Sequence, residues 1–148
     1  PLVTDEEAEV LGAERVDDLV ELCRRADAVS LHAPALPATR HMIGRAELRA
    51  MPDDGVLINT ARGMCVDHDA LVAELEKGRL KALLDVTEPE PLPENHPLRH
   101  LPNATVTSHI AGPPALNMGD QAAADVERWL RGEQPLCVTT EDELGHVA

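Results

Sequence analysis

The stretch GVLINTARG, residues 55–63, decides the fold class, because it joins a short apolar run to a turn of small and polar residues. Similar apolar runs occupy residues 28–32 (AVSLH), 81–86 (KALLDV) and 104–108 (ATVTS), and none of them alternates strictly between apolar and polar positions. Runs of this length are typical of parallel strands that are covered on both faces. We therefore expect an α/β fold built on a parallel sheet.

Amphipathic segments lie between these runs, as crossover helices require. We expect helices over 17–26, 44–51 and 68–78, with Asp17 and Asp67 as N-caps and Gly78 at a C-terminal end. A longer helix is expected over 115–131, ending at Gly132, because apolar side chains recur there at helical spacing: Met118, Ala122, Val126 and Trp129. We interpret residues 13–16 as a short strand, 89–102 as an ordered functional loop, and 141–148 as a short terminal helix.

Composition narrows the possible functions. A chain of 148 residues has the size of one domain, and without Phe or Tyr its core must be aliphatic. A formal net charge of -14 would repel a phosphate backbone, so nucleic acid is an unsuitable partner. Cys23, Cys65 and Cys137 are widely spaced, which argues against a disulfide framework and favours a reducing cytoplasm. No apolar run approaches the roughly 18 residues of a membrane span.

Polar residues follow each expected strand, at the edge where open parallel sheets bind ligands. Arg62, Glu90 and His109 fall after three successive runs. Taken singly, an Arg or a Glu at such a place is usually a solvated surface residue, and a lone His is usually structural. Their occurrence at the same rim of one sheet is what indicates a reactive site.

The motifs SLHAP (30–34), INTARG (58–63), DVTEPEP (85–91) and SHIAG (108–112) resemble the signatures of D-isomer-specific 2-hydroxyacid dehydrogenases. The resemblance runs from Pro1 to about Val138 and covers nearly the whole chain. It implies a Rossmann-like sheet and hydride transfer between a nicotinamide cofactor and a 2-hydroxy or 2-oxo acid.

The resemblance also implies roles for the three strand-end residues. Arg62 would bind the substrate carboxylate with its planar guanidinium. His109 would exchange a proton with the substrate oxygen, and Glu90 would pair with His109 and favour its charged form. Cofactor contacts are implied for a wider set: His32, Pro34, Thr39, Thr60, Ala61, Arg62, Asp85, His109 and Gly112.

The sequence departs from the family pattern in several ways. Thr87 stands where an aromatic residue is common, and Ser108 stands where Pro commonly precedes the histidine. No GxGxxG phosphate loop occurs, so weak cofactor binding is expected from these residues alone. We interpret 1–148 as a partial dinucleotide-binding domain, with 139–148 as its tail and without the family's first two strands and substrate domain. The strand at 28–32 would then expose an edge that pairs with another chain or with more of a longer polypeptide.

Several alternatives remain open. His96 and His100 are spaced four apart, but Pro97 and the lack of a third ligand argue against a metal site. Cys65 is interpreted as a buried thiol, and His41, His68 and His146 as surface residues. The function is either that of a 2-hydroxyacid dehydrogenase, that of a formate-type relative, against which Glu90 argues, or that of a non-catalytic nucleotide-binding or assembly module. NAD is the expected cofactor, NADP is not excluded, and family analogy favours a homodimer.

Overall fold

The computed structural model describes residues 3–112 and 118–136. The chain divides into two compact units, Pro1–Ile110 and Ala111–Ala148, and each is described by itself. The expected terminal helix at 141–148 lies outside the described residues.

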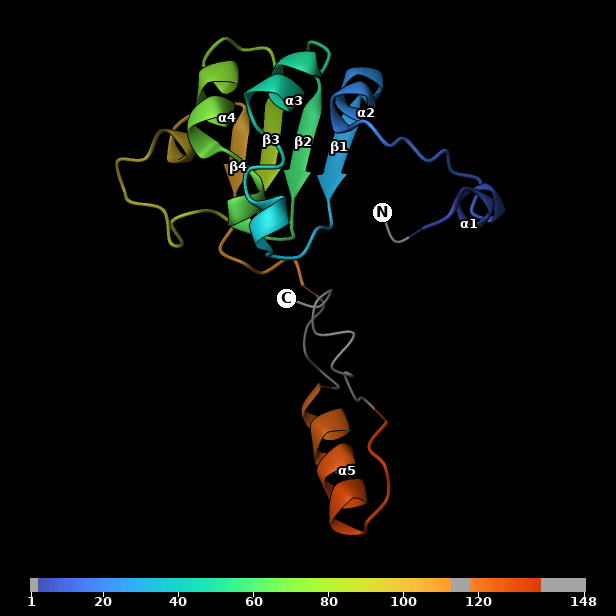
Figure 1. The fold of residues 1–148 in the computed structure, drawn as a ribbon. Coiled ribbons are helices and arrows are strands. Elements are labelled where there is room, and N and C mark those ends of the chain that lie inside the picture. Colours follow the sequence, from blue (N-terminus) through green and yellow to red (C-terminus); the bar gives the residue numbers. More distant parts are fainter. Residues whose placement is uncertain (1–2, 113–117, 137–148) are drawn as a thin grey trace. The chain divides into compact units, whose positions relative to one another are not determined.

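The first unit is built on four parallel strands in the order β1-β2-β3-β4. They are β1 Ala28–Leu31, β2 Val56–Asn59, β3 Lys81–Leu84 and β4 Ala104–Val106. The register pairs Leu57 of β2 with Val29 of β1 and with Ala82 of β3. The expected α/β, Rossmann-like parallel sheet is therefore confirmed, with each strand inside its predicted run (Figure 1).

Three helices connect or precede these strands: α2 Leu19–Arg25, α3 Arg45–Ala50 and α4 His68–Leu75. Asp67 caps α4 as expected, because its side chain accepts a hydrogen bond from the Ala70 amide. The cap of α2 is Asp18 rather than the predicted Asp17, since the Asp18 side chain accepts from the Glu21 amide. Single turns of 3-10 helix occur at η1 Pro37–Thr39, η2 Gly63–Cys65 and η3 Pro97–Arg99.

The prediction that the strands are covered on both faces is wrong for the described part of the first unit. In β1 and β3 buried residues alternate with exposed ones, and Leu83 of β3 is 45% exposed. The strand order follows the chain order, so every crossover runs in the same direction across the sheet. Right-handed crossovers then place α3 and α4 on the same face (Figure 1), and α2, which precedes β1, packs against α3.

Two further expectations near the start of the chain need correction. Residues 13–16 form no strand, because in the described part of the chain no neighbouring strand offers them a hydrogen-bonded ladder. A helix that was not predicted, α1 Asp5–Val10, precedes them. Its signal is present in the sequence: the Thr4 side chain accepts from the Glu7 amide while the Glu7 carboxylate accepts from the Thr4 amide, which is a capping box.

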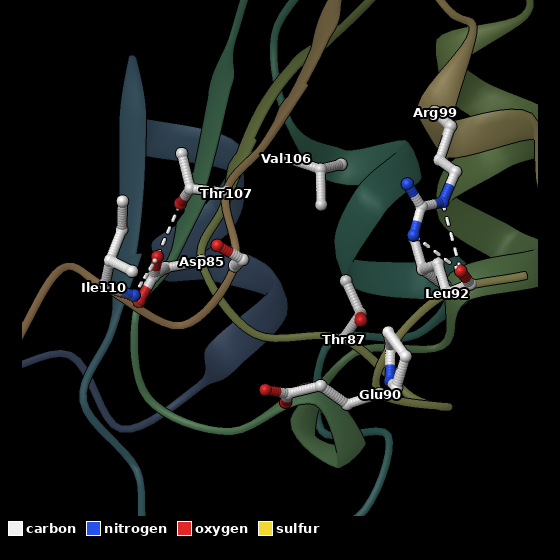
Figure 2. Close-up of a pocket in the computed structure, with 10 residues that line it drawn as sticks. Asp85, Thr87, Glu90, Leu92, Arg99, Val106, Thr107 and Ile110 are labelled. Atoms are coloured by element: carbon white, nitrogen blue, oxygen red, sulfur yellow. Dashed lines mark hydrogen bonds between the residues drawn. The ribbon is translucent and has the colours of Figure 1, made fainter. Parts of the chain in front are cut away.

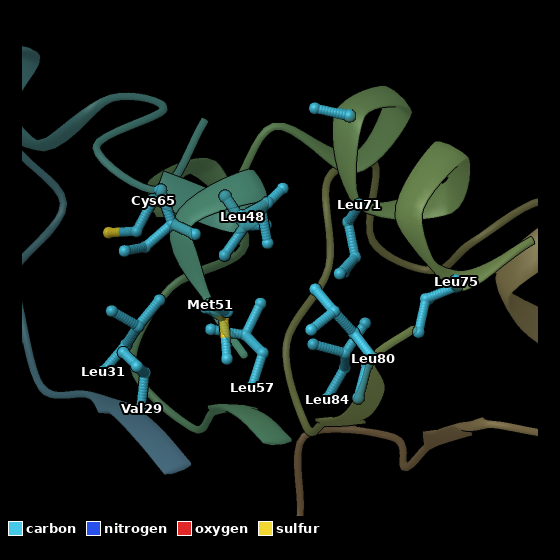
Figure 3. Close-up of a cluster of buried hydrophobic side chains, with 14 of the residues drawn as sticks. Val29, Leu31, Leu48, Met51, Leu57, Cys65, Leu71, Leu75, Leu80 and Leu84 are labelled. Atoms are coloured by element: carbon cyan, nitrogen blue, oxygen red, sulfur yellow. The ribbon is translucent and has the colours of Figure 1, made fainter. Parts of the chain in front are cut away.

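The core lies between the sheet and its three helices and is aliphatic, as the composition predicts (Figure 3). Leu57 is fully buried in the central strand β2, and Leu48 of α3 and Leu71 of α4 are buried in the same cluster. Because one face of the sheet carries this cluster, every second strand residue contributes to it.

Leu57→Ala should lower the free energy of unfolding by about 2 to 5 kcal/mol, because it leaves a cavity in the centre of this cluster. Leu83→Ala, on the open face of the neighbouring strand, should cost about 1 kcal/mol or less. Urea denaturation followed by circular dichroism measures both. Equal losses would show that the sheet does not bury one face in preference to the other.

His68, predicted to lie on the surface, is buried in the first turn of α4 and is 7% exposed. Its Nε2 atom has no hydrogen-bond partner among the described residues. Burial lowers the pKa of His68, and the nearby His96 and His41 lower it further, whereas Glu88 and Asp67 oppose the shift. The imidazole is therefore kept neutral in the folded state.

This burial makes stability depend on pH. A folded-state pKa below the unfolded value of about 6.5 means that the unfolded chain takes up the proton first. The contribution of His68 is complete above about pH 6.5 and is lost as the pH falls toward the lowered pKa. His68→Gln should flatten the dependence of the urea midpoint on pH between about 7 and 5. An identical slope for the wild type and His68→Gln would contradict the assignment.

The second unit contains α5 Met118–Leu130, within the predicted helix and ending before Gly132, which has φ +75°. The turn after it is held by the Arg128 Nε–H group, which donates to the Gln134 carbonyl, and by the Leu136 amide, which donates to the Asp125 carboxylate. Among the described residues no helix is both long enough and apolar enough to traverse a bilayer.

Candidate active site

The carboxyl end of β2 is shaped by Asn59, whose side chain is completely buried. Its Nδ2 atom donates to the Arg62 carbonyl at 2.9 Å and its Oδ1 atom accepts from the Ala61 amide at 3.1 Å. These two bonds close the turn over residues 59–62 in the manner typical of Asn after a strand. The turn presents Arg62 at the surface, where its guanidinium donates to the Ala61 carbonyl at 2.8 Å.

Gly63 follows Arg62 and packs directly against the chain that leaves β3. A Cβ atom at Gly63 would lie 2.1 Å from the carbonyl carbon of Thr87 and 2.7 Å from the amide nitrogen of Glu88. Only a residue without a side chain allows this approach. The contact joins the turn that carries Arg62 to the loop that carries Glu90.

At the end of β3, Asp85 is buried and binds the end of the neighbouring strand (Figure 2). Its carboxylate accepts hydrogen bonds from the Thr107 hydroxyl and from the Ile110 amide, at 2.5 and 2.9 Å. Its carbonyl accepts from the His109 amide at 2.9 Å. Asp85 therefore binds the Thr107 side chain before His109 and the backbone amides of His109 and Ile110.

His109 itself has φ +59°, a left-handed conformation that residues with a side chain rarely adopt. The surrounding hydrogen bonds to Asp85 hold it there, and such locally strained backbone is typical of functional positions. Its Nδ1 atom lies 2.8 Å from Oε1 of Glu90, and both side chains remain about half exposed. The expected pairing of Glu90 and His109 is therefore present.

This arrangement has a defined chemical capacity. A hydrogen bond from Nδ1–H to an ionised carboxylate sets the tautomer of the ring and leaves Nε2 available to exchange a proton. Arg62 supplies a positive charge after β2, which is the strand that pairs with β3.

The other residues expected to contact a cofactor are spread over the same strand ends. Thr60 is exposed beside Arg62, and His32 is exposed after β1 with its Nε2 atom 3.0 Å from the Ser30 hydroxyl. The Thr39 hydroxyl donates to the Pro34 carbonyl at 2.6 Å, so these two residues shape the loop after β1. Gly112 belongs to the second unit.

The described residues contain no group of three or more His, Cys, Asp or Glu side chains that could hold a metal ion. His96 and His100, which are spaced four apart in the sequence, both contact the backbone. His96 accepts a hydrogen bond from the Leu98 amide, and the His100 ring lies 2.8 Å from the Glu94 carbonyl. Cys23 and Cys65 are both free and buried. Burial raises the pKa of Cys23 to about 11, which makes it a poor nucleophile.

Sequence reasoning assigned no role to Asn59, Thr107 or Arg99, although each shapes the site. Asn59 could have been found, because a buried Asn two residues before a small residue at a strand end is a known turn former. Thr107 bonds to Asp85, and Arg99 bonds to the Leu92 carbonyl. Each bond joins residues that lie in different loops or strands, so no local sequence pattern predicts it.

The parallel sheet with reactive side chains at its carboxyl edge is the arrangement of a dinucleotide-binding enzyme domain. Residues 1–111 match the family model described as the NAD binding domain of D-isomer specific 2-hydroxyacid dehydrogenases. The chain is 40% identical over 137 residues to a D-3-phosphoglycerate dehydrogenase of Methanocaldococcus jannaschii. The aligned region covers 90% of this chain and 26% of that protein.

Solved structures agree with this match. The apo form of D-mandelate dehydrogenase from Rhodotorula graminis is 36% identical with a TM-score of 0.84, covering 95% of this chain and 42% of its own. D-lactate dehydrogenase with NAD+ from Lactobacillus jensenii is 30% identical with a TM-score of 0.83, covering 95% and 47%. The chain belongs to the D-isomer-specific 2-hydroxyacid dehydrogenase family, and it spans less than half the length of these relatives.

Gly63→Ala should force the turn after β2 away from the loop after β3, because the added carbon would overlap the Thr87 carbonyl group. We expect a lower unfolding temperature and altered amide chemical shifts at Thr87 and Glu88 in NMR spectra of this chain. Gly112→Ala is the matched control, since a Cβ there meets nothing within 4 Å in the described part of the chain. Unchanged shifts at Thr87 in Gly63→Ala would mean that the two loops do not touch.

Proposed function

We propose that the protein is a nicotinamide-dependent 2-hydroxyacid dehydrogenase, in which Arg62 anchors the substrate carboxylate and His109, paired with Glu90, is the acid and base. The observation that carries this proposal is the 2.8 Å contact between His109 Nδ1 and Glu90 Oε1 at the carboxyl edge of the sheet. A histidine–carboxylate pair of this kind is suited to general acid–base catalysis.

The strand ends fit the nicotinamide half of a dinucleotide. The turn over residues 59–62 is closed by the buried Asn59, which keeps the small Ala61 and the exposed Thr60 at the rim where a flat ring could approach. We assign Thr60, Ala61, Asp85 and His109 to this half, and His32, Pro34 and Thr39 to the adenosine half. The bound nicotinamide supplies or accepts the hydride.

Arg62 would bind and orient the substrate. A 2-oxo acid carries a planar carboxylate next to its reactive carbonyl, and a guanidinium can grip both carboxylate oxygens at once. That grip fixes the carbonyl carbon relative to the sheet edge, because the Arg62 turn is itself fixed by Asn59 and by the Gly63 contact.

His109 would hold the proton at Nε2 and deliver it to the carbonyl oxygen as that oxygen gains negative charge. Glu90 accepts the hydrogen bond from Nδ1–H and so holds the ring with Nε2 turned to the substrate. In the reverse direction Nε2 accepts the hydroxyl proton, while the hydrogen bond between Nδ1–H and Glu90 keeps the ring in place.

We further propose that residues 1–148 act as the nucleotide-binding part of a cytoplasmic homodimeric enzyme that takes a small 2-hydroxy or 2-oxo acid. The free thiols of Cys23 and Cys65 are compatible with a reducing compartment. The relatives are named for phosphoglycerate, mandelate and lactate, which indicates that the family fold does not restrict the substrate to one acid.

Arg62→Ala should lower 2-oxo-acid-dependent oxidation of NADH or NADPH by the full-length protein about 100-fold or more, because the carboxylate loses its charged partner. Arg62→Lys should recover only part of the rate, since an ammonium cannot form the two parallel bonds. Glyoxylate, pyruvate and hydroxypyruvate are suitable test substrates, with the absorbance of the reduced cofactor as the readout.

His109→Asn is the companion variant and should lower kcat by about 100- to 10,000-fold through loss of proton transfer. Lys77→Ala, an exposed residue of the turn that follows α4, should leave kcat and KM unchanged. Wild-type rates in both Arg62→Ala and His109→Asn would discard the proposed function.

A further inference from the structure

The loop that carries Glu90 runs from Asp85 to His96 without regular secondary structure. Three of its residues, Pro89, Pro91 and Pro93, have no amide hydrogen to donate. The position of Glu90 therefore depends on bonds that side chains make to the loop. Within it, the Thr87 hydroxyl donates to the Pro89 carbonyl at 3.0 Å.

A second bond reaches the loop from η3. Both Nε and Nη2 of Arg99 donate to the Leu92 carbonyl, at 3.0 and 2.7 Å, so one oxygen accepts two hydrogen bonds from the guanidinium (Figure 2). Leu92 is two residues past Glu90 and its side chain is buried. A charged donor makes this contact stronger than an ordinary backbone hydrogen bond.

The η3 turn that carries Arg99 is itself fixed. Leu98, the preceding residue of η3, is 1% exposed and belongs to the core. The Asn103 side chain, just before β4, donates to the carbonyls of Leu75 and Leu80, each at 2.8 Å. Core packing of Leu98 thus fixes η3, and the Asn103 bonds fix the chain that follows it to the end of α4 and to the residue before β3.

Arg99 and Glu90 also line the same hollow of about 600 Å³, together with Thr87 and Leu92. Figure 2 shows Arg99 on the Leu92 side of this hollow and Glu90 below it. Since Glu90 is about half exposed, its carboxylate is not held by packing. A displacement at the Leu92 carbonyl would consequently move Glu90 relative to His109.

We infer that Arg99 is a positioning residue, which holds the loop so that the Glu90 carboxylate meets Nδ1 of His109. Arg99 acts through the Leu92 backbone, because its guanidinium donates to the Leu92 carbonyl. Its kinetic effect rests on the proposed function, whereas its effect on the Glu90–His109 bond does not.

The inference is tested first in this chain by NMR, through the imidazole nitrogen signals of His109 and the exchange of its Nδ1 proton with water. Arg99→Leu should abolish the signature of the protonated, hydrogen-bonded Nδ1, and Arg99→Lys should retain part of it. Arg79→Leu is the matched control, because Arg79 also donates to a backbone carbonyl, that of Met51, at 2.7 Å, and lies before β3 at the opposite end of the strands.

In the full-length protein Arg99→Leu should lower kcat by about 10- to 100-fold with little change in KM, because the acid is misplaced while the carboxylate anchor stays. The pH profile of kcat should also differ from the wild type, and Arg99→Lys should restore part of both. Arg79→Leu should affect neither.

An unchanged His109 signal in Arg99→Leu would overturn the inference, as would an equal loss in Arg79→Leu. If Arg99→Leu does not fold, an unaltered signal in Arg99→Lys would overturn it in the same way. Failure of the proposed function has a different pattern: Arg62→Ala and His109→Asn would then keep wild-type rates, whatever the NMR result for Arg99.

Discussion

Parallel pairing of the strands is the constraint on which the site depends. In a parallel sheet all carboxyl ends lie at one edge, so residues that follow β2, β3 and β4 meet there despite their distance along the chain. Arg62, Glu90 and His109 are separated by 28 and 19 residues, and only this topology brings their loops to the same rim. The placement of these three residues at one rim is a consequence of the parallel pairing rather than of local sequence.

Strand ends alone would not give a defined geometry, and buried polar groups provide it. Asn59 closes one turn, Asp85 clamps both sides of His109, and Gly63 allows two loops to touch through their backbones. Each polar group is buried with partners, which is the condition under which burial stabilises one conformation instead of penalising the fold. Glu90 and His109 are attached to this fixed backbone, and their half-exposed side chains remain accessible to a ligand.

Much of this could be predicted from the sequence, and the exceptions have physical reasons. The strands and the helices between them were found because continuous apolar runs and helical spacing are local signals. The covering of one sheet face, the burial of His68 and the lack of a strand at 13–16 depend on which elements lie alongside, which a local pattern does not contain. The helix over Asp5–Val10 was missed although Thr4 and Glu7 form a capping box. Arg99 was missed because its contact with Leu92 crosses a proline-rich loop whose path no sequence rule specifies.

The most direct test of the account is a crystal structure of the full-length protein with NADH and a 2-oxo acid analogue such as oxamate. The account predicts that the analogue's carboxylate lies on the Arg62 guanidinium and its carbonyl oxygen within hydrogen-bond distance of His109 Nε2, with Glu90 still on Nδ1. An analogue bound away from Arg62, or a His109 ring turned away from both Glu90 and the analogue, would contradict it.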